Sequence, residues 1–530
     1  MPGCARPIAL IGSLIVSLLS ADEALAQKSG GILRVYHRDS PSSMSMHEQG
    51  TISAAMPMSQ VFNNLVVYDM KVPQNSLNSI VPDLATGWAW SADGTKLTFK
   101  LRQGVKWHDG KPFSAKDVKC TWDLLTDKAK DALRLNWRAG WYHNLAEVTT
   151  QGDDEATFHL KRPQPAMLAL LAAGFSMVYP CHVSPREMRT HPIGTGPFKF
   201  VEFKPNQLIR LTRNPDYWKK GLPYLDGVEY TIIANRSTAI LAFISGQFDL
   251  TFPYEVTIPL VKDVKSQYPD AVCEVGATNL ASNLLINWAP PFDNAELRQA
   301  IALTIDRKAF VDILTEGKGD IGAAMLPGPE GIWGLPPDIL KTLPGYDPDT
   351  AKNRTRAREI MRKLGYGPDN RLKVKLASRN LAIYRDPAVI LIDHLKEIYI
   401  DGELEIVETA NWGPKLVRRD FQFGLSTVGN GVDEPDQNFY ESYVCGSRTY
   451  TGYCNPEVDK LVDQQSIETD QEKRRKIVWE IDRRLQEDVA RPMLYFMRAG
   501  TCWRPEVKGI RLMSNSIYNN WRLEDVWLDR

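Results

Sequence analysis

The stretch from Leu97 to Leu125 constrains the fold of this chain more than any other segment. Apolar and polar side chains alternate over residues 97–102, which is the pattern of a half-buried strand. The pair Asp109-Gly110 predicts a hairpin-type turn. Ser114, followed three residues later by Asp117, is a capping-box signature that predicts the first turn of a helix. A strand, a tight turn and a capped helix in this order indicate a mixed α/β fold.

Three more segments carry distinctive motifs. Residues 193–216 read IGTGPFKFVEFKPNQLIRLTRNPD, residues 222–250 contain LPYLDG and SGQFDL, and residues 283–314 contain PPFDNAELRQAIALTIDR. Taken in order with the first stretch, they closely resemble the family-5 extracytoplasmic solute-binding proteins of ABC importers, the peptide- and nickel-binding family. The four blocks are spread over roughly residues 31–510, so the resemblance covers nearly the whole chain.

Strand and helix patterns alternate along the chain in two groups, which indicates two α/β lobes. A chain of 530 residues is also longer than one compact core supports. The last block is predicted as one long helix, capped by Asp293 and stopped at Gly317. The resemblance implies a periplasmic-binding-protein clam shell, with the ligand between the lobes and closure by bending of a hinge.

The resemblance also implies domain boundaries. The expected divisions are a signal peptide over residues 1–26, lobe I over 27–276 plus 495–530 with an extra subdomain at about 60–190, and lobe II over 277–494. The chain is expected to cross between the lobes near Gly276–Asn279 and near Met493–Phe496.

The N-terminus has the features of an export signal. Residues 8–19 form an apolar run that is shorter than the ~20 residues of a bilayer span. Ala24-Leu25-Ala26 is an A-x-A cleavage site, so Gln27 is the expected first residue of the mature protein. Cys4 precedes the apolar run, whereas a lipoprotein cysteine would follow it. We therefore expect a soluble periplasmic protein without a lipid anchor.

The charge balance and the motif content exclude several classes of function. The 64 basic and 64 acidic residues cancel, so the chain shows no sign of binding nucleic acid or a membrane surface. It contains no G-x-S-x-G and no Walker A motif, and its eight histidines are scattered. We expect no enzyme activity, cofactor or metal, and the resemblance implies a monomer whose partners are a solute and the ABC permease.

Six cysteines remain after the predicted cleavage, which suits an oxidising compartment. Cys445 and Cys454 flank the loop GSRTYTGY, and the resemblance implies a disulfide there because related proteins carry one. Cys120 lies in an apolar-rich helical stretch and is expected to be a buried thiol. The pairing of the others is left open: Cys181, Cys273 and Cys502.

The resemblance also suggests ligand residues in the second lobe. Arg379 falls near the place where peptide-binding relatives hold a ligand carboxylate, and a guanidinium offers two parallel donors for that purpose. Trp412 resembles the tryptophan that walls the pocket of relatives. A surface arginine and a core tryptophan remain the alternatives. Tyr384, which follows Arg379 in the segment ASRNLAIYRDP, and Asn283, at the start of the block 283–314, complete this part of the predicted site.

The segment from Val428 to Pro435 matches the loop where peptide-binding relatives place an aspartate for the peptide amine. Aligning on Glu434-Pro435 puts Gly431 at that position and displaces the nearest acid, Asp433, by two residues. A carboxylate must lie within ~3 Å of an ammonium to compensate its lost hydration. The usual amine anchor is therefore absent from its place, and a neutral or differently charged solute contacting Asn430 becomes an alternative to a peptide.

Two other functions are alternatives to solute capture. Nickel binding has only single histidine candidates, His47 and His394, and no cluster, and His47 is also one of the predicted ligand residues. The fold alone also permits a periplasmic interaction or chaperone-like protein, because one fold hosts many functions. Capture of a peptide or other small polar solute for an ABC importer is the function that the sequence favours.

Overall fold

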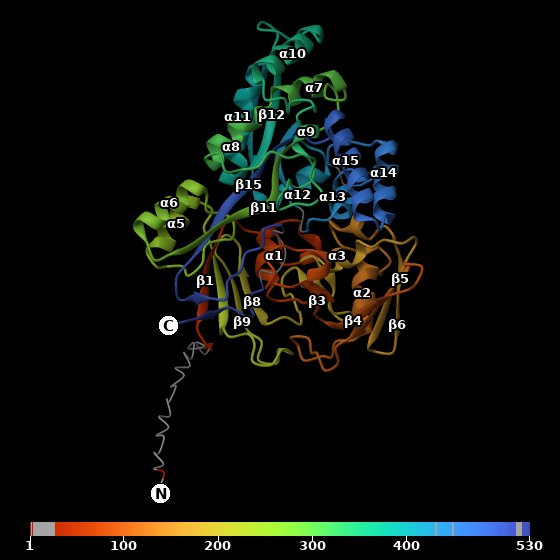
Figure 1. The fold of residues 1–530 in the computed structure, drawn as a ribbon, viewed down its shortest axis with the longest axis vertical. Coiled ribbons are helices and arrows are strands. Elements are labelled where there is room, and N and C mark those ends of the chain that lie inside the picture. The colour runs from red at the N-terminus through yellow and green to blue at the C-terminus, as the bar shows by residue number, and fades with distance from the viewer. Residues whose placement is uncertain (2, 4–26, 430–431, 448–449, 516–521) are drawn as a thin grey trace.

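The computed structural model describes residues 1, 3, 27–429, 432–447, 450–515 and 522–530. Most of the predicted signal peptide and the predicted ligand residues Asn430 and Gly431 lie outside the described residues. The described chain forms two α/β lobes, with lobe I at the bottom and lobe II at the top of Figure 1.

Lobe I is built on a four-stranded sheet of order β1-β10-β9-β8, in which β1 is parallel to β10 and the other pairs are antiparallel. Its strands are β1 (Ile32–His37), β8 (Phe198–Lys204), β9 (Leu208–Arg213) and β10 (Gly227–Ile232). Its helices are α1 (Ile52–Met58), α5 (Arg236–Ile244) and α6 (Ile258–Gln267), with a 3-10 turn at Met46–Glu48. Near the C-terminus, β16 (Val507–Lys508) pairs with β17 (Trp527–Leu528).

A separate antiparallel sheet of order β4-β5-β7-β6 lies at the lower right of Figure 1. Its strands are β4 (Ala85–Trp90), β5 (Lys96–Leu101), β6 (Leu145–Gln151) and β7 (Glu155–Leu160), and β2 (Val66–Tyr68) pairs with β3 (Ile80–Pro82) nearby. Its helices are α2 (Ala115–Leu125), α3 (Met167–Ala172) and α4 (Pro185–Met188), with 3-10 turns at Leu77–Ser79 and Ala139–Tyr142. The capping box is confirmed, because Ser114 caps α2 and its N–H donates to Asp117 at 2.9 Å.

Lobe II is built on a five-stranded mixed sheet of order β13-β12-β14-β11-β15. Its strands are β11 (Val272–Ile286), β12 (Leu372–Arg379), β13 (Ile400–Val407), β14 (Phe423–Gly429) and β15 (Met493–Trp503). Its helices are α7 (Ala295–Thr304), α8 (Arg307–Thr315), α9 (Pro337–Leu340), α10 (Thr350–Lys363), α11 (Ala382–Lys396), α12 (Thr409–Val417), α13 (Pro435–Ser442), α14 (Pro456–Ile467) and α15 (Gln471–Glu487).

The single long helix predicted after Asp293 is wrong. The structure has two helices there, with Asn294 rather than Asp293 as the N-cap of α7. The Asp306 side chain accepts a hydrogen bond from the N–H of Ala309 and so begins α8 as a new helix. An aspartate that binds its own downstream backbone favours a helix start over a helix interior.

Two long strands, β11 and β15, run from lobe I into lobe II (Figure 1). They pair antiparallel from Val272 with Trp503 to Ala277 with Arg498. The ladder then shifts register and resumes where Ala281 faces Phe496. The irregular residues of β11 between these two points include Asn279, which has a positive φ of 45°.

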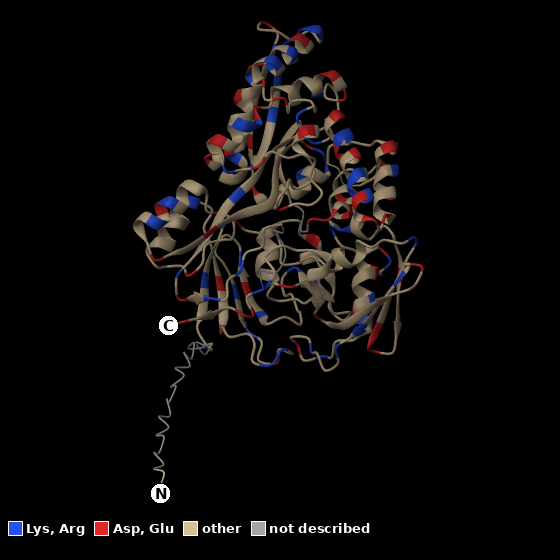
Figure 2. Cartoon of the chain, in the orientation of Figure 1, with Lys and Arg blue, Asp and Glu red and all other residues tan. Residues whose placement is uncertain are grey.

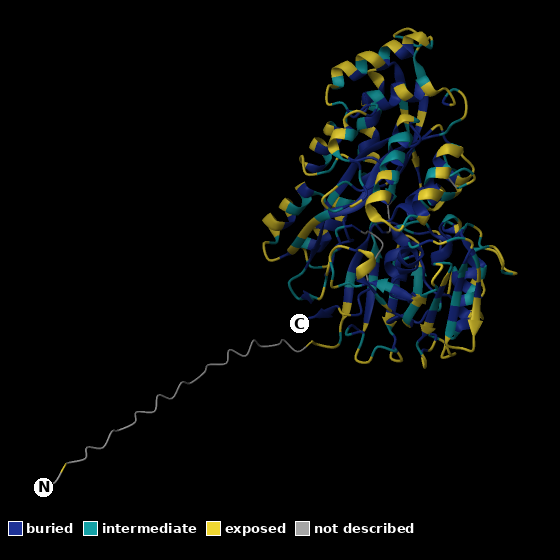
Figure 3. Ribbon diagram, turned by 45° about the vertical axis from the view of Figure 1, so that its right-hand side comes forward, coloured by how far each residue is buried: buried dark blue, intermediate teal, exposed yellow. Residues whose placement is uncertain are grey.

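The core continues through both lobes beneath charged helices. In Figure 3 the central strands are buried and the outer faces of the helices are exposed. Figure 2 shows acidic and basic residues interspersed on the outer helices α10, α14 and α15. No helix within the described ranges has both the length and the apolar character that crossing a bilayer requires.

Three disulfides cross-link the chain. The predicted Cys445–Cys454 bond is confirmed, and Cys273 pairs with Cys502 across β11 and β15. The expectation of a free Cys120 thiol is wrong, because it bonds to Cys181. The Asp117 carboxylate accepts the N–H of Cys181 at 2.9 Å, which brings that residue beside the same helix.

Removing a disulfide is expected to lower the free energy of unfolding by an amount that grows with the length of the loop that the disulfide closes. Replacing Cys445 and Cys454 together by serine should lower the free energy of unfolding by about 3 kcal/mol, for a separation of 9 residues. The same change at Cys120 and Cys181, separated by 61 residues, should cost about 4 kcal/mol. Urea unfolding measures both values. Peptide mapping without reductant that found these thiols free would contradict the pairing.

Candidate functional site

A cavity of about 520 Å³ lies between the two lobes. This volume is in the usual range for small-molecule sites, about 300–1,000 Å³. Lobe I contributes residues 48–52 and 134–138, and lobe II contributes residues 409–418 and 426–428 among others. The wall of the cavity is therefore complete only when both lobes contribute their residues.

An ion pair joins the lobes at the cavity wall. The Nη2 atom of Arg379, at the end of β12, lies 2.5 Å from Oδ2 of Asp39, which follows β1. Nη1 donates to the hydroxyl of Tyr384 at 2.8 Å and Nε donates to Thr409 at 3.1 Å. Burial opposes the charge on Asp39, but Arg379 and Arg38 outweigh it and hold the pKa of Asp39 at about 2. The Asp39 carboxylate is thus ionised at every ordinary pH.

Three of the predicted ligand residues line the cavity, namely Arg379, Tyr384 and Trp412. The donors of Arg379 are already engaged by the protein itself, as the contacts above show. Trp412 lines the cavity and also packs in a small core cluster with Leu285 and Leu416. Direct contact of Arg379, Tyr384 and Trp412 with a solute stays a prediction.

Asn283 and His47 are buried beside the cavity and do not line it. The side-chain oxygen of Asn283 accepts a hydrogen bond from Nε of Arg491 at 2.8 Å. Nε2 of His47 lies 3.0 Å from the carbonyl oxygen of Met177, and burial lowers the pKa of His47 to about 3. His47 is therefore a neutral core histidine in this structure. Asn283 acts on the cavity by holding Arg491, which lines it.

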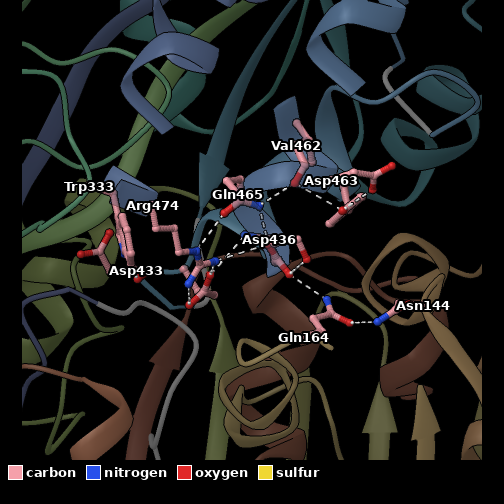
Figure 4. Close-up of polar contacts among 12 residues, drawn as sticks. Asn144, Gln164, Trp333, Asp433, Asp436, Val462, Asp463, Gln465 and Arg474 are labelled. Carbon is pink, nitrogen blue, oxygen red and sulfur yellow. Dashed lines mark hydrogen bonds and ion pairs between the residues drawn. The ribbon is translucent and has the colours of Figure 1, made fainter. Parts of the chain in front are cut away.

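Asp433 also lies away from the cavity lining. Its Oδ2 accepts the N–H of Ile332 at 2.9 Å, and its backbone carbonyl accepts the indole N–H of Trp333 at 2.9 Å. Figure 4 shows Asp433 beside Trp333 at one end of a polar network. Asp433 is thus bound within the protein, and contact between its carboxylate and the amine of a solute stays a prediction.

That polar network joins the lobes at a second place (Figure 4). Asp436, at the start of α13, accepts from Gln465 and Ser466 of lobe II and from Gln164 of lobe I, the last at 2.7 Å. Arg474 is the guanidinium of the network, and it contacts both Glu434 and Asp436. One cation thus forms ion pairs with two buried carboxylates at the lobe interface.

Replacing Asp433 by asparagine is expected to stabilise the protein above neutral pH. Burial raises the pKa of Asp433 to about 7, so the folded state holds a proton that the unfolded state releases near its ordinary pKa of 3.8. Stability from this group is therefore present at low pH and is lost as pH rises toward 7. Asp433→Asn should gain up to about 4 kcal/mol at pH 8 and little at pH 4. Urea unfolding at both pH values measures the difference, and an equal effect at both would contradict the assignment.

The cavity residues that sequence reasoning missed include Trp137, Arg138 and Arg491. The Trp137 indole N–H donates to the carbonyl of Glu48 at 2.9 Å, and its ring fits against Gly50 of lobe I and Gly413 of lobe II. A Cβ added at either glycine would lie about 3 Å from that ring. The segment NWRAGW at residues 136–141, in which an arginine stands between two tryptophans, is the sequence signal that could have indicated Trp137 and Arg138 as cavity residues.

Metal ligands do not gather at this site. Across the residues that the structure describes, no three His, Cys, Asp or Glu side chains form a group that could hold a metal ion. The cavity instead presents arginines, aromatic rings and hydroxyl groups. Its chemistry suits recognition of a polar organic molecule.

Comparison with known proteins adds an independent finding. The family model described as "Bacterial extracellular solute-binding proteins, family 5 Middle" matches residues 79–450. The probable di/tripeptide-binding protein 5 of Pseudomonas aeruginosa is 25% identical over 536 residues, covering 94% of this chain and 96% of that protein. The stretch matched by the family model includes the cavity-lining residues Arg138, Arg379 and Trp412.

Solved structures of the same shape agree with the fold. AppA from Bacillus subtilis, in complex with a nonapeptide, matches with a TM-score of 0.83 at 23% identity, covering 95% of this chain and 100% of that one. AgaA from A. tumefacien R10, in complex with agropinic acid, matches with a TM-score of 0.82 at 22% identity, covering 94% and 99%. The two-lobed binding-protein fold is therefore shown.

Proposed function

Because this chain belongs to the bacterial extracellular solute-binding proteins of family 5, we propose that it captures a peptide or another small polar solute between its lobes and delivers it to an ABC permease. The observation that carries this proposal is the 520 Å³ cavity, whose wall is assembled from both lobes. A solute in that cavity would contact both lobes at once and so favour the closed form over the open one. This coupling is what a capture-and-release protein needs.

The proposed lobe boundaries follow the long strands. Lobe I comprises residues 27–276 and 495–530, with an extra subdomain at about 60–190, and lobe II comprises 277–494. Support comes from β11 and β15, because each contains one of the proposed crossing points. The separate sheet β4-β5-β7-β6 supports the extra subdomain.

The proposed location is the periplasm, reached by cleavage after Ala26. The short apolar run and the A-x-A site support export, and three disulfides suit an oxidising compartment. N-terminal sequencing of the exported protein is expected to begin at Gln27. A product that begins at Met1, or one retained in the membrane, would overturn this part of the proposal.

The names of the similar proteins leave the solute open. One is a probable di/tripeptide-binding protein, one was solved with a nonapeptide and one with agropinic acid. In this chain the acids of the cavity wall are Glu48, which pairs with Arg189, and Glu441, which accepts the indole N–H of Trp141 at 2.7 Å. A peptide amine would therefore have Glu441 as its available carboxylate.

Mass spectrometry and scattering together test the proposal. Native mass spectrometry of the purified mature protein is expected to show a retained small molecule. Small-angle scattering should show a smaller radius of gyration with that molecule than after its removal. A protein that retains nothing, keeps one radius and instead holds unfolded polypeptides would favour a chaperone-like role and overturn solute capture.

A further inference from the structure

The cavity wall carries an excess of positive charge. Two glutamates face six arginines, which are Arg38, Arg134, Arg138, Arg379, Arg418 and Arg491. Three of these have carboxylate partners in the protein: Arg38 pairs with Glu255, Arg134 with Glu48, and Arg379 with Asp39. Arg418 is exposed. The two buried arginines that remain, Arg138 and Arg491, come from different lobes.

Arg138 is buried in lobe I without a carboxylate. Only 4% of the residue is exposed, and its guanidinium lies over the ring of Phe175, 3.7 Å from the ring centroid. Its Nε and Nη1 atoms are buried and have no hydrogen-bond partner among the described residues. A buried charged donor without an acceptor is costly, which favours an acceptor supplied by a bound ligand at a residue that lines the cavity.

Arg491 is buried in lobe II, just before β15. It is 5% exposed, and Asn283 accepts its Nε–H at 2.8 Å. No described residue forms an ion pair with it, although the Glu441 carboxylate and two tyrosines act on it electrostatically. Burial lowers the pKa of Arg491 from its ordinary value, as expected for a cation that has lost its water. Asn283 therefore positions a guanidinium that has no ion-pair partner among the described residues.

Two other buried arginines donate to the backbone of the protein, although their Nε atoms, like that of Arg138, have no hydrogen-bond partner among the described residues. Nη1 of Arg307 donates to the carbonyl of Gly345 at 2.6 Å, and Nη1 of Arg298 donates to two backbone carbonyls. Neither residue lines the cavity. Backbone carbonyls thus accept from Nη1 of these two arginines, whereas among the described residues no backbone carbonyl accepts from the side chain of Arg138 or Arg491.

We propose that the solute of this cavity carries at least two anionic groups, one bound by Arg138 of lobe I and the other by Arg491 of lobe II. This inference rests on the proposed function and specifies the class of solute. A dianion neutralises both buried guanidiniums only when both lobes reach it, so binding and closure are coupled by charge. Carboxylates and phosphates share the required chemistry, because both accept paired N–H donors from a guanidinium.

A series of matched probes tests the charge requirement. Straight-chain dicarboxylates of four to ten carbons are compared with hexanoate, adipamide and 1,6-diaminohexane, which carry one, no and opposite charges at similar size. Fructose 1,6-bisphosphate serves as the phosphate probe. We expect at least one dianion to raise the melting temperature of the wild-type protein and to give measurable calorimetric binding, while adipamide and the diamine do neither. Whether the dicarboxylates or fructose 1,6-bisphosphate bind more tightly identifies the anionic groups of the solute as carboxylates or phosphates.

Variants assign the effect to the two arginines. Arg138→Met and Arg491→Met keep much of the side-chain volume and remove the charge, and each is expected to weaken dianion binding about 10- to 100-fold. Arg491→Met should melt at or above the wild-type temperature without ligand, because it removes an uncompensated buried cation. Arg307→Met is the matched control: it should melt lower than wild type and keep the dianion-induced shift. Arg491→Lys should recover part of the binding.

The outcomes separate this inference from the proposed function. Neutral or cationic probes that bind as well as the dianions, or dianion binding that survives in both methionine variants, would overturn the inference and leave solute capture standing. A lower melting temperature of ligand-free Arg491→Met with an unchanged dianion shift would also overturn it, since the residue would then be structural. Wild-type protein that binds no probe and retains no solute would count against solute capture itself and against this inference.

Discussion

Replacing Arg474 by methionine is expected to lower the free energy of unfolding by about 3–5 kcal/mol at pH 8. The reason is that Arg474 is the cation of the buried network in Figure 4. Without it, Glu434 and Asp436 remain buried as carboxylates, and only 4% and 0% of these residues are exposed. Removing one partner leaves an uncompensated charge, which costs more than the pair contributes.

The loss should become smaller as pH falls toward 5. Burial already raises the pKa of Glu434, and Arg474 works against that rise. In the variant the pKa rises further, so the folded state takes up a proton that the unfolded state does not, and stability increases as pH falls. Urea unfolding at pH 8 and pH 5 measures the effect. Arg475→Met, one residue along α15 in a pair of a half-buried arginine with the exposed Glu472, should change stability by only about 0.5 kcal/mol. A loss below about 1 kcal/mol at pH 8 for Arg474→Met would contradict the role given to the network.

Replacing Asp39 by asparagine is expected to weaken solute binding by about 2–5 kcal/mol. The change leaves Arg379 without its carboxylate at the wall of the cavity, where only 4% of the Arg379 side chain is exposed. Because the pair joins the lobes, its loss should favour the open form and speed up solute release. Calorimetry and dissociation rates with the solute identified by mass spectrometry give the two quantities.

A double-mutant cycle makes this prediction specific. Asp39→Asn combined with Arg379→Met should bind no more weakly than either single variant, because the double change leaves no buried charge unpaired. Arg385→Met, which breaks an exposed pair with Asp386, is the control and should leave binding unchanged. Additive losses in the cycle would mean that the two residues act independently on the solute.

Local sequence signals predicted the elements better than the contacts between them. The alternation at residues 97–102 and the Ser114–Asp117 cap correctly gave β5 and α2, because both depend on neighbouring residues. The break at Asp306 was also local, but an apolar periodicity that continued across it concealed the cap. Propensity and periodicity thus fix most elements and leave their ends less certain.

The candidate site depended on partners far away in sequence. Arg379 was predicted to be available for a ligand, yet its partner Asp39 lies 340 residues earlier in the chain. Asn283 was predicted to contact the solute, and in the structure it positions Arg491, 208 residues later. Cys120 was assigned as a thiol because nothing in its helix announces Cys181. The fold decides such pairings, and one sequence without its tertiary contacts does not reveal them.

The Cys273–Cys502 bond has a mechanical consequence for a protein that closes on its solute. It ties β11 to β15 on the lobe I side of the irregular residues near Asn279. Tied strands cannot slide past each other, so shear between the lobes is suppressed and rotation about the irregular segment remains. The oxidised protein should therefore open and close along a single angular coordinate, and reduction of this one bond should add a translational freedom that broadens the ensemble of open shapes.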